Sequence, residues 1–421
     1  MIQIPRGTQD ILPAESYKWQ FIEKKLNEIA NNYNYKEIRT PIFESTDLFV
    51  RGVGGSTDIV NKEMYTFNDK GDRSLTLKPE GTAPVVRSYI ENKMQHDVTQ
   101  PVKVYYLDPM FRYERKQKGR YRQFVQFGIE AIGVEDPLID VEVISMLMTI
   151  YRSFGLENLR LYINSIGDQD SRANYNEALV GHFKPSIHEF CSDCQTRIDT
   201  NPMRILDCKK DRDHELIQTA PRMYDYLNDA SKQYFEAVKS NLKAIGIEYE
   251  VDYNLVRGLD YYTHTAFEVM SDAEGFGAIT TLCGGGRYNG LLELLDGPEE
   301  TGIGFALSIE RLLLALEAEG IEIPEPEGID LYICTLDDKA MEKASHLIHS
   351  LRANGISCDI DYKRRKLKAQ MKDADRKGAA YTIVLGENEL SAGNVELKHM
   401  ATGDSKTVHL DELVTVLEEE R

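Results

Sequence analysis

The segment Gly320–Gly328 (GIEIPEPEG) constrains the fold most, because a short stretch rich in proline and glutamate predicts an extended linker. The chain of 421 residues is also too long for a single hydrophobic core. The pattern of apolar residues differs on the two sides of this linker. We therefore expect one domain over residues 1–325 and a second domain over residues 329–421.

The first domain combines helices and strands without a regular alternation. Apolar residues spaced three and four apart predict helices over Ala14–Tyr33 and Leu138–Phe154. Short β-rich runs between them are separated by turns such as Asn68–Gly71. Residues from about 170 to 247 are polar, helical in pattern and interrupted by prolines, which indicates a mainly helical insertion. This organisation favours an α+β domain over repeated βαβ units.

Beyond the linker, predicted strands and helices alternate. The expected elements are a strand over Asp330–Thr335, a helix over Lys339–Ala353, a strand over Ile356–Tyr362, a helix over Leu367–Lys377 and a strand over Tyr381–Leu385. Units of this length are typical of a small α/β domain with a largely parallel sheet.

The distribution of charge bears on the ligands that the chain can bind. With 50 basic and 69 acidic residues the net charge is −19, which on average argues against nucleic acid as a partner. Two segments depart from this average: Arg112–Arg122 holds six basic residues and one acidic residue, and Lys363–Lys377 holds eight basic and two acidic residues. A solvated surface explains either segment alone. Two such patches on an acidic chain keep nucleic acid open as a ligand.

Three features bear on the cellular compartment. No stretch approaches the roughly 18 uninterrupted apolar residues of a membrane helix. The first ten residues (MIQIPRGTQD) lack the basic start and apolar core of a signal peptide. Six cysteines are too sparse for a disulfide framework. These features predict a cytoplasmic, reduced protein with no membrane partner.

The clearest sign of a ligand site is an alternating pattern in one predicted strand. One set of its side chains is apolar and predicts a surface that faces the core: Val125, Phe127, Ile129 and Ala131. The opposite set does not suit a core: Phe124, Gln126, Gly128 and Glu130. Gly128 weakens a strand unless something must approach closely, so we expect a ligand to lie over it. A solvent-exposed strand face is the alternative.

Three segments resemble the motifs of class II aminoacyl-tRNA synthetases. Phe111–Glu114, the following loop and Arg120–Glu130 are similar to motif 2. Gly302–Arg311 is similar to motif 3, and the chain around Pro41 is similar to the weaker motif 1, which in that class builds a dimer interface. These motifs leave the identity of the amino acid open.

Further segments narrow the resemblance to histidyl-tRNA synthetases of the bacterial type. Leu255–Thr263 (LVRGLDYYT) resembles their histidine-specific segment, and Gly284–Tyr288 (GGGRY) resembles its companion glycine turn. Lys78–Thr82 (KPEGT) is similar to the strand that receives the amino group. The resemblance implies a class II α+β catalytic domain with an antiparallel sheet, and a C-terminal α/β domain that binds the anticodon.

The resemblance also implies an activity: ATP-dependent formation of histidyl-adenylate from L-histidine, and transfer of histidine to the 3′ end of tRNA(His). It assigns the catalytic role to Arg257 and Arg112. ATP contacts are implied for Arg112, Glu114, Arg120, Phe124 and Arg311. Histidine contacts are implied for Glu80, Gly81, Thr82, Arg112, Gln126, Glu130, Arg257, Tyr261 and Tyr262. Contacts to the acceptor end of tRNA are implied for Arg115, Lys116 and Gln117.

Arginine suits the catalytic role because it stays charged and its planar fork spans two oxygens. Mg²⁺ is expected with the nucleotide, and a homodimer is expected from motif 1. A non-catalytic, histidine-sensing regulatory paralogue is the alternative function. Such proteins typically lack the C-terminal domain and degrade the segment around Arg257, and both are present here.

A cysteine pair raises the question of zinc. Cys191 and Cys194 form a C-x2-C pair and Cys208 follows, with His188 and His214 nearby. The second half lacks a paired CxxC or CxxH, so the spacing of a zinc site is incomplete. We therefore expect no protein-bound zinc.

Overall fold

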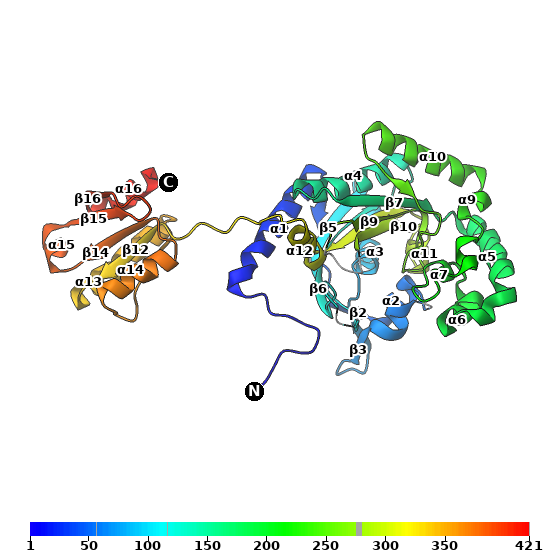
Figure 1. The fold of residues 1–421 in the computed structure, drawn as a ribbon, viewed down its shortest axis with the longest axis horizontal. Helices are drawn as coiled ribbons and strands as arrows, with labels where there is room; N and C mark the ends of the chain where they lie inside the picture. Colours follow the sequence, from blue (N-terminus) through cyan, green and yellow to red (C-terminus); the bar gives the residue numbers. More distant parts are fainter. Residues whose placement is uncertain (56, 116, 275–279, 421) are drawn as a thin grey trace. The chain divides into compact units, whose positions relative to one another are not determined.

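The computed structural model describes residues 1–55, 57–115, 117–274 and 280–420. The chain divides into two compact units, Met1–Ile323 and Pro324–Arg421 (Figure 1). Among the described residues, no helix combines the length and the apolar character that a membrane span requires.

The first unit is built on an eight-stranded sheet with the order β1-β5-β6-β11-β10-β9-β7-β8. Its strands are β1 (Lys36–Glu37), β5 (Val102–Phe111), β6 (Gln123–Ile132), β7 (Leu159–Ser165), β8 (Glu250–Val251), β9 (Thr263–Ser271), β10 (Thr281–Arg287) and β11 (Gly302–Ser308). The outer pairs β1–β5 and β7–β8 are parallel, and the pairs between them are antiparallel. The antiparallel sheet predicted for the first domain is thus confirmed in its central pairs.

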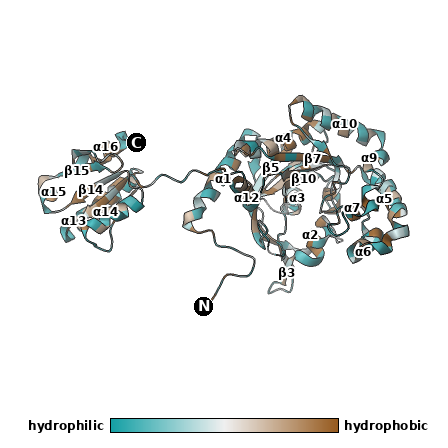
Figure 2. Ribbon diagram, viewed as in Figure 1, coloured by the Kyte–Doolittle hydropathy of each residue, from teal (hydrophilic) through white to brown (hydrophobic). Residues whose placement is uncertain are grey.

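One face of this sheet carries the main hydrophobic core. The core combines residues of the sheet with residues of α1 (Pro13–Asn32), α4 (Pro137–Ser153), α10 (Asp229–Ala244) and α12 (Ile309–Ala318). The core-facing set predicted for β6 lies here: Phe127, Ile129 and Ala131 are fully buried, and Val125 packs against the cluster. In Figure 2, α4 is largely brown, whereas α10 mixes brown and teal, as expected for a helix with one side in solvent.

The other face of the sheet packs against shorter elements. A second core joins strand residues to α3 (Thr82–Glu91), α11 (Leu291–Leu294) and the helices that follow β7. Those helices are α5 (Gln169–Phe183), η3 (Lys184–Glu189), α6 (Ser192–Thr200), α7 (Met203–Leu206), α8 (Glu215–Gln218) and α9 (Met223–Tyr226). They are the green helices beside β10 in Figure 1. The mainly helical insertion expected from the sequence is therefore present, although α10 belongs to the core on the opposite face.

A small satellite sheet completes the first unit. Its strands have the order β2-β4-β3, and both pairs are antiparallel. The elements of this region are β2 (Phe43–Ser45), α2 (Thr46–Val53), η1 (Ile59–Glu63), β3 (Tyr65–Asn68), β4 (Ser74–Leu77) and η2 (Met94–His96).

The second unit contains a five-stranded sheet with the order β13-β12-β14-β15-β16. Its elements are β12 (Leu331–Thr335), α13 (Asp338–Ala353), β13 (Cys358–Ile360), α14 (Leu367–Arg376), β14 (Tyr381–Leu385), α15 (Glu387–Ala392), β15 (Asn394–His399), β16 (Ser405–His409), η4 (Leu410–Glu412) and α16 (Leu413–Glu419). The strands β12, β13 and β14 are parallel, as the alternation of strands and helices predicts. The antiparallel hairpin of β15 and β16 extends the sheet and was missing from the prediction.

Gly284–Tyr288 differs from its predicted conformation. We expected a glycine turn, but Gly284, Gly285 and Gly286 lie within β10, a central strand of the sheet. A Cβ at Gly284 would collide with the Arg257 guanidinium. The glycine is therefore needed for the close approach of a side chain, and the chain does not reverse there.

Candidate active site

A cavity of about 400 Å³ lies over the face of β6 that points away from the main core. The structure brings together in its wall all the side chains that sequence analysis assigned to catalysis, histidine or ATP. These residues are Glu80, Gly81, Thr82, Arg112, Glu114, Arg120, Phe124, Gln126, Glu130, Arg257, Tyr261, Tyr262 and Arg311. They come from segments far apart in the chain, which the neighbouring strands β5, β6, β11, β10 and β9 bring together.

Glu130 forms the floor at one end of the cavity, where it is 1 % exposed. Its Oε1 accepts a hydrogen bond from the Thr82 hydroxyl at 2.8 Å, and its Oε2 accepts one from the Tyr288 hydroxyl at 2.7 Å. Gly304 on the neighbouring strand leaves the space for this carboxyl group, because a Cβ there would collide with Oε2. Burial raises the pKa of Glu130 to about 8, despite the two hydrogen bonds that oppose the shift.

The space over Gly128 is filled by the protein itself. The Tyr106 ring from β5 lies against Gly128 and against Gly81, and a Cβ at either glycine would collide with it. The prediction that a ligand lies directly over Gly128 was therefore wrong. The ring occupies that position and becomes part of the cavity wall.

Near Glu130, the polar side chains of Glu80 and Gln126 differ in how many hydrogen bonds they accept from the protein. Glu80 accepts hydrogen bonds from the backbone N–H groups of Thr82 and Ala83 at 2.8 and 2.9 Å, so it caps the start of α3. Tyr261 donates its hydroxyl to the same carboxylate at 3.4 Å. The buried Oε1 of Gln126 has no hydrogen-bond partner among the described residues. An unpartnered buried acceptor in a cavity wall suits a ligand that donates a hydrogen bond.

Positive charge gathers at the other end of the cavity. Arg120 and Arg112 share one counter-ion, Glu114, at 3.2 and 3.9 Å. Arg311 donates to the Thr281 carbonyl oxygen, and burial together with the charge of Arg120 lowers its pKa. Three guanidinium groups around one carboxylate leave excess positive charge. This excess suits a polyanion such as the triphosphate of a nucleotide.

Arg257 lies between β9 and the insertion. Its Nη1 is 3.6 Å from Glu268 Oε1, and its guanidinium lies 5.7 Å from the centre of the Tyr262 ring. Its Nε is buried without a hydrogen-bond partner among the described residues. Arg204 of the insertion donates to the Arg257 carbonyl oxygen at 3.0 Å. The insertion thus contacts the LVRGLDYYT segment directly.

The loop between β5 and β6 lines the cavity through Gly119, Arg120 and Tyr121 and presents other side chains to solvent. Arg115 and Gln117 are exposed there, and Gln117 pairs with Arg120 in an isolated bridge. Lys116 lies outside the described residues. Arg115 and Gln117 are therefore accessible to a partner larger than the contents of the cavity.

The family model described as "Histidyl-tRNA synthetase" matches residues 7–312, and the model described as "Anticodon binding domain" matches residues 330–420. The chain belongs to the histidyl-tRNA synthetase family.

Full-length relatives agree with this assignment. The chain is 66% identical over 422 residues to the histidine–tRNA ligase of Staphylococcus carnosus, covering 100% of this chain and 99% of the relative. It is 68% identical over 415 residues to that of Staphylococcus aureus strain JH9, covering 98% and 99%. The crystal structure of the apo S. aureus histidyl-tRNA synthetase superposes with a TM-score of 0.86 at 61% identity, covering 99% of this chain and 100% of that chain. The crystal structure of a histidyl-tRNA synthetase from Nostoc, 21% identical with a TM-score of 0.68 and covering 100% of both chains, shares the fold.

The family and fold expected from the sequence are thus confirmed. The cavity is also lined by side chains that the sequence did not point to: Tyr106, Asp207, Lys209, Glu268 and Tyr288. Glu268 and Tyr106 occur on strands next to predicted site residues, so a strand register would have revealed them. Asp207 and Lys209 come from the insertion, whose position over the cavity no local pattern encodes.

The buried carboxyl group gives this family member a testable pH dependence. Folding raises the pKa of Glu130 from its ordinary value of 4.5 to about 8, so the native state holds a proton that the unfolded chain has lost. Stability from this proton is present below pH 4.5 and is lost as the pH rises toward 8. For the ligand-free protein we expect the free energy of unfolding to fall by up to about 1.4 kcal/mol per pH unit in that window. We expect Glu130→Gln to abolish this contribution.

The fluorescence of Trp19 reports unfolding of the first unit, because the chain has one tryptophan and it lies in the main core. Urea titrations between pH 5.5 and 8.5 would compare the natural protein, Glu130→Gln and the exposed control Glu418→Gln. The control should keep the pH slope of the natural protein. Equal slopes for all three proteins would contradict the proton assigned to Glu130.

Proposed function

We propose that this chain joins L-histidine to ATP, forming histidyl-adenylate and pyrophosphate, and then transfers histidine to the 3′ end of tRNA(His) with release of AMP. One observation carries the proposal: a single cavity has the Glu130 cluster at one end and the arginine cluster at the other. The cavity can therefore hold two ligands next to each other: an amino acid with a polar side chain and a nucleoside triphosphate. The regulatory alternative is not favoured, because ligases match over the full length of the chain.

The Glu130 end suits an imidazole side chain. Neutral imidazole offers one hydrogen-bond donor and one acceptor. We propose that Glu130 accepts the hydrogen bond from the imidazole N–H and that the Tyr262 hydroxyl donates one to the other ring nitrogen. Tyr262 as a residue is 7% exposed. A ligand N–H would favour the ionised form of Glu130 and offset the cost of its burial. A side chain of another shape would leave these buried groups unpaired, which can reject it by about 10⁴-fold or more.

The backbone atoms of histidine are assigned to the neighbouring polar groups. Its ammonium group would donate to Gln126 Oε1, which has no partner among the described protein groups, and to Glu80. The Tyr261 hydroxyl and the Thr82 backbone N–H would orient Glu80 through their present hydrogen bonds, while the Thr82 hydroxyl orients Glu130. Gly81 makes room for the Tyr106 ring in the wall beside these groups, since a Cβ there would collide with that ring.

The arginine end suits ATP. We assign Phe124 to stacking on adenine, Glu114 to the adenine amino group, and the outer phosphates to Arg120 and Arg311. Mg²⁺ would enter bound to the nucleotide and supply further positive charge to the phosphates.

The first reaction step needs charge stabilisation more than a proton donor. An oxygen of the histidine carboxylate attacks the α-phosphorus, the new P–O bond forms, and the bond to pyrophosphate breaks. Negative charge on the α-phosphate oxygens rises in the transition state. Arg257 and Arg112 are the cations assigned to it, because fixed donors aimed at developing charge give the largest rate gain. Both arginines are held by contacts with the protein, which would limit their motion. Arg257 pairs with Glu268, and Arg112 donates to the Pro79 carbonyl oxygen at 2.7 Å.

The second step requires contact with tRNA. We assign the acceptor end to the loop residues Arg115, Lys116 and Gln117. Residues 1–325 would carry out both chemical steps, and residues 329–421 would bind the anticodon. The exposed cations of α14 and its preceding turn would then lie along the phosphate backbone: Lys363, Lys366, Lys368, Lys372 and Arg376.

Assembly and compartment are part of the same proposal. Near motif 1 the satellite sheet exposes three large apolar side chains, Ile42, Phe43 and Phe67, which are 38, 50 and 44% exposed. A homodimer would cover them, as exposed apolar patches commonly mark interfaces. A cytoplasmic location fits the sparse cysteines, all six of which are free thiols.

ATP–pyrophosphate exchange with each of the twenty amino acids tests the proposal. We expect exchange with histidine and at least about 10³-fold less with any other amino acid at equal concentration, because of the polar readout. Charging of tRNA(His) should follow in the presence of that tRNA. A folded protein that exchanges with no amino acid, yet binds histidine, would instead support the regulatory alternative.

A further inference from the structure

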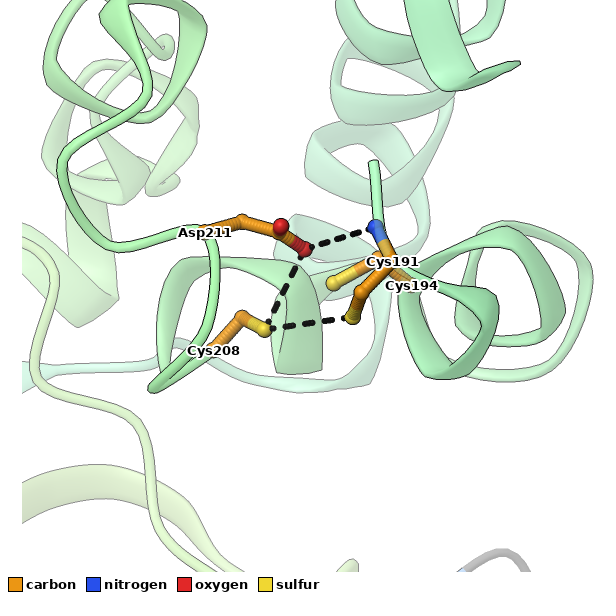
Figure 3. Close-up of side chains that lie close together, drawn as sticks. All are labelled: Cys191, Cys194, Cys208 and Asp211. Atoms are coloured by element: carbon orange, nitrogen blue, oxygen red, sulfur yellow. Dashed lines mark hydrogen bonds between the residues drawn. The ribbon is translucent and has the colours of Figure 1, made fainter. Parts of the chain in front are cut away.

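Three cysteines and one aspartate converge within the insertion, away from the Glu130 and arginine clusters. Cys191 precedes α6, Cys194 lies in its first turn, Cys208 follows α7, and Asp211 lies in the turn beyond. Their three sulfur atoms and one carboxylate oxygen all lie within 4.8 Å of one another. Figure 3 shows the four side chains pointing toward a common centre.

Two distances within this cluster are close to the edges of a tetrahedron around zinc. Zn–S bonds of about 2.3 Å place two sulfur ligands about 3.8 Å apart, and a Zn–O bond of about 2.0 Å places sulfur and oxygen about 3.5 Å apart. The sulfur atoms of Cys191 and Cys208 are 3.6 Å apart, and Cys208 Sγ lies 3.3 Å from Asp211 Oδ2. The Cys191 backbone N–H donates to the same Oδ2 at 3.1 Å, which orients the carboxylate toward the sulfur atoms.

The structure removes the argument against zinc that the sequence supported. The sequence predicted no zinc because no cysteine or histidine completes a pair with Cys208. Asp211 completes that pair, and the full pattern is C-x2-C-x13-C-x2-D, two short pairs as in zinc sites of the C-x2-C…C-x2-C kind. Carboxylate oxygen is an accepted zinc ligand, although rarer than cysteine or histidine in structural sites.

We propose that Cys191, Cys194, Cys208 and Asp211 bind one structural Zn²⁺ ion, which holds the insertion against the wall of the active-site cavity. The four groups would fill the tetrahedral shell, so the ion has no open position for chemistry. Binding would release the thiol protons, since cysteine coordinates zinc as thiolate.

The surroundings of the cluster explain what the ion would stabilise. The helices α7, α8 and α9 have four residues each, too short to be stable by themselves. Cys208 and Asp211 flank Lys209, and both Lys209 and Asp207 line the cavity. Arg204 in the same segment donates to the Arg257 carbonyl oxygen. A metal that fixes residues 204–211 would therefore fix one wall of the site.

Metal content tests the proposal without reference to activity. The full-length protein, expressed with added zinc and passed through a desalting column, should contain about one zinc per chain by mass spectrometry of the metal. Cys191→Ser, Cys194→Ser, Cys208→Ser and Asp211→Asn should each reduce this content at least fivefold. The control Cys358→Ala removes a buried thiol of the second unit and should keep one zinc.

Cobalt and thiol chemistry distinguish the remaining outcomes. Co²⁺ added to the metal-free protein should give the visible bands of a tetrahedral thiolate complex, and Cys208→Ser should lose them. Protein without zinc whose three thiols alkylate freely would overturn the proposal. A Cys191–Cys208 disulfide found by non-reducing peptide mapping would overturn it as well.

The positioning role has its own measurement and rests on the proposed function. Asp211→Asn should raise the KM for ATP or histidine in pyrophosphate exchange at least threefold, with Cys358→Ala within about twofold of the natural protein. Loss of zinc with unchanged KM values would overturn the positioning role. If no exchange occurs even in the natural protein, the proposed function fails, while the metal measurements above still decide the zinc site.

Discussion

Replacing Arg257 by alanine should lower histidine-dependent pyrophosphate exchange by about 10²–10³-fold, the range found when a fixed donor to developing charge is removed. The loss should appear in kcat, because the charge on the α-phosphate grows only in the transition state. Histidine should still bind with a Kd within about threefold, since the side-chain contacts proposed for Glu130 and Tyr262 remain. Exchange kinetics and calorimetric titration with histidine measure the two effects separately.

The structure supplies the controls for this variant. Arg257 is ion-paired with Glu268, and its removal leaves that largely buried carboxylate without its cation. Unfolding monitored by Trp19 must therefore show that Arg257→Ala is folded under assay conditions. Arg257→Lys keeps the charge but loses the planar fork, so it should restore only part of the rate. Arg51→Ala breaks an exposed ion pair with Asp296 and should leave exchange unchanged. Turnover of Arg257→Ala near the natural value would contradict the assigned role.

The face of β6 shows how far a local pattern carries a prediction. Side chains of a strand alternate with a period of two, so the sequence of β6 alone separated the core set from the cavity set. The occupant of the space above Gly128 depends on β5, whose register places Tyr106 there. Register between strands depends on tertiary pairing, which one strand does not encode. For this reason the sequence of β6 predicted a ligand above Gly128, where the structure has the Tyr106 ring.

The glycines of β10 failed as a prediction for a related reason. Consecutive glycines usually mark turns, since they tolerate conformations that other residues avoid. In this chain Gly284 lies mid-strand because the Arg257 side chain crosses it. Only the three-dimensional neighbour distinguishes these two uses of glycine. Asp211 was missed in the same way. An aspartate three residues after a cysteine is common on an acidic chain, and only its distance to the sulfur atoms identifies it as a possible ligand.

Deleting residues 329–421 should separate the two reaction steps. The active-site cavity lies wholly within the first unit, so histidine-dependent pyrophosphate exchange should stay within about threefold of the natural rate. Charging of tRNA(His) should fall at least about 100-fold in kcat/KM, equivalent to about 2.7 kcal/mol of lost interaction. The deletion removes the exposed cations around α14, which we assign to the tRNA backbone.

A milder variant tests the same assignment with the fold intact. Lys368→Ala combined with Lys372→Ala removes two exposed charges from α14. The slope of the logarithm of kcat/KM for tRNA charging against the logarithm of the salt concentration should then become shallower by the amount that about two phosphate contacts contribute. Arg365 is a poor choice for this purpose, since it is already paired with Asp361 and Asp373 inside the unit. The matched control, Lys339→Ala with Lys343→Ala, removes two exposed charges from α13 instead and should preserve the slope. Equal losses of exchange and charging in the deletion variant would contradict an anticodon role, because a domain that binds only tRNA has no means of slowing adenylate formation.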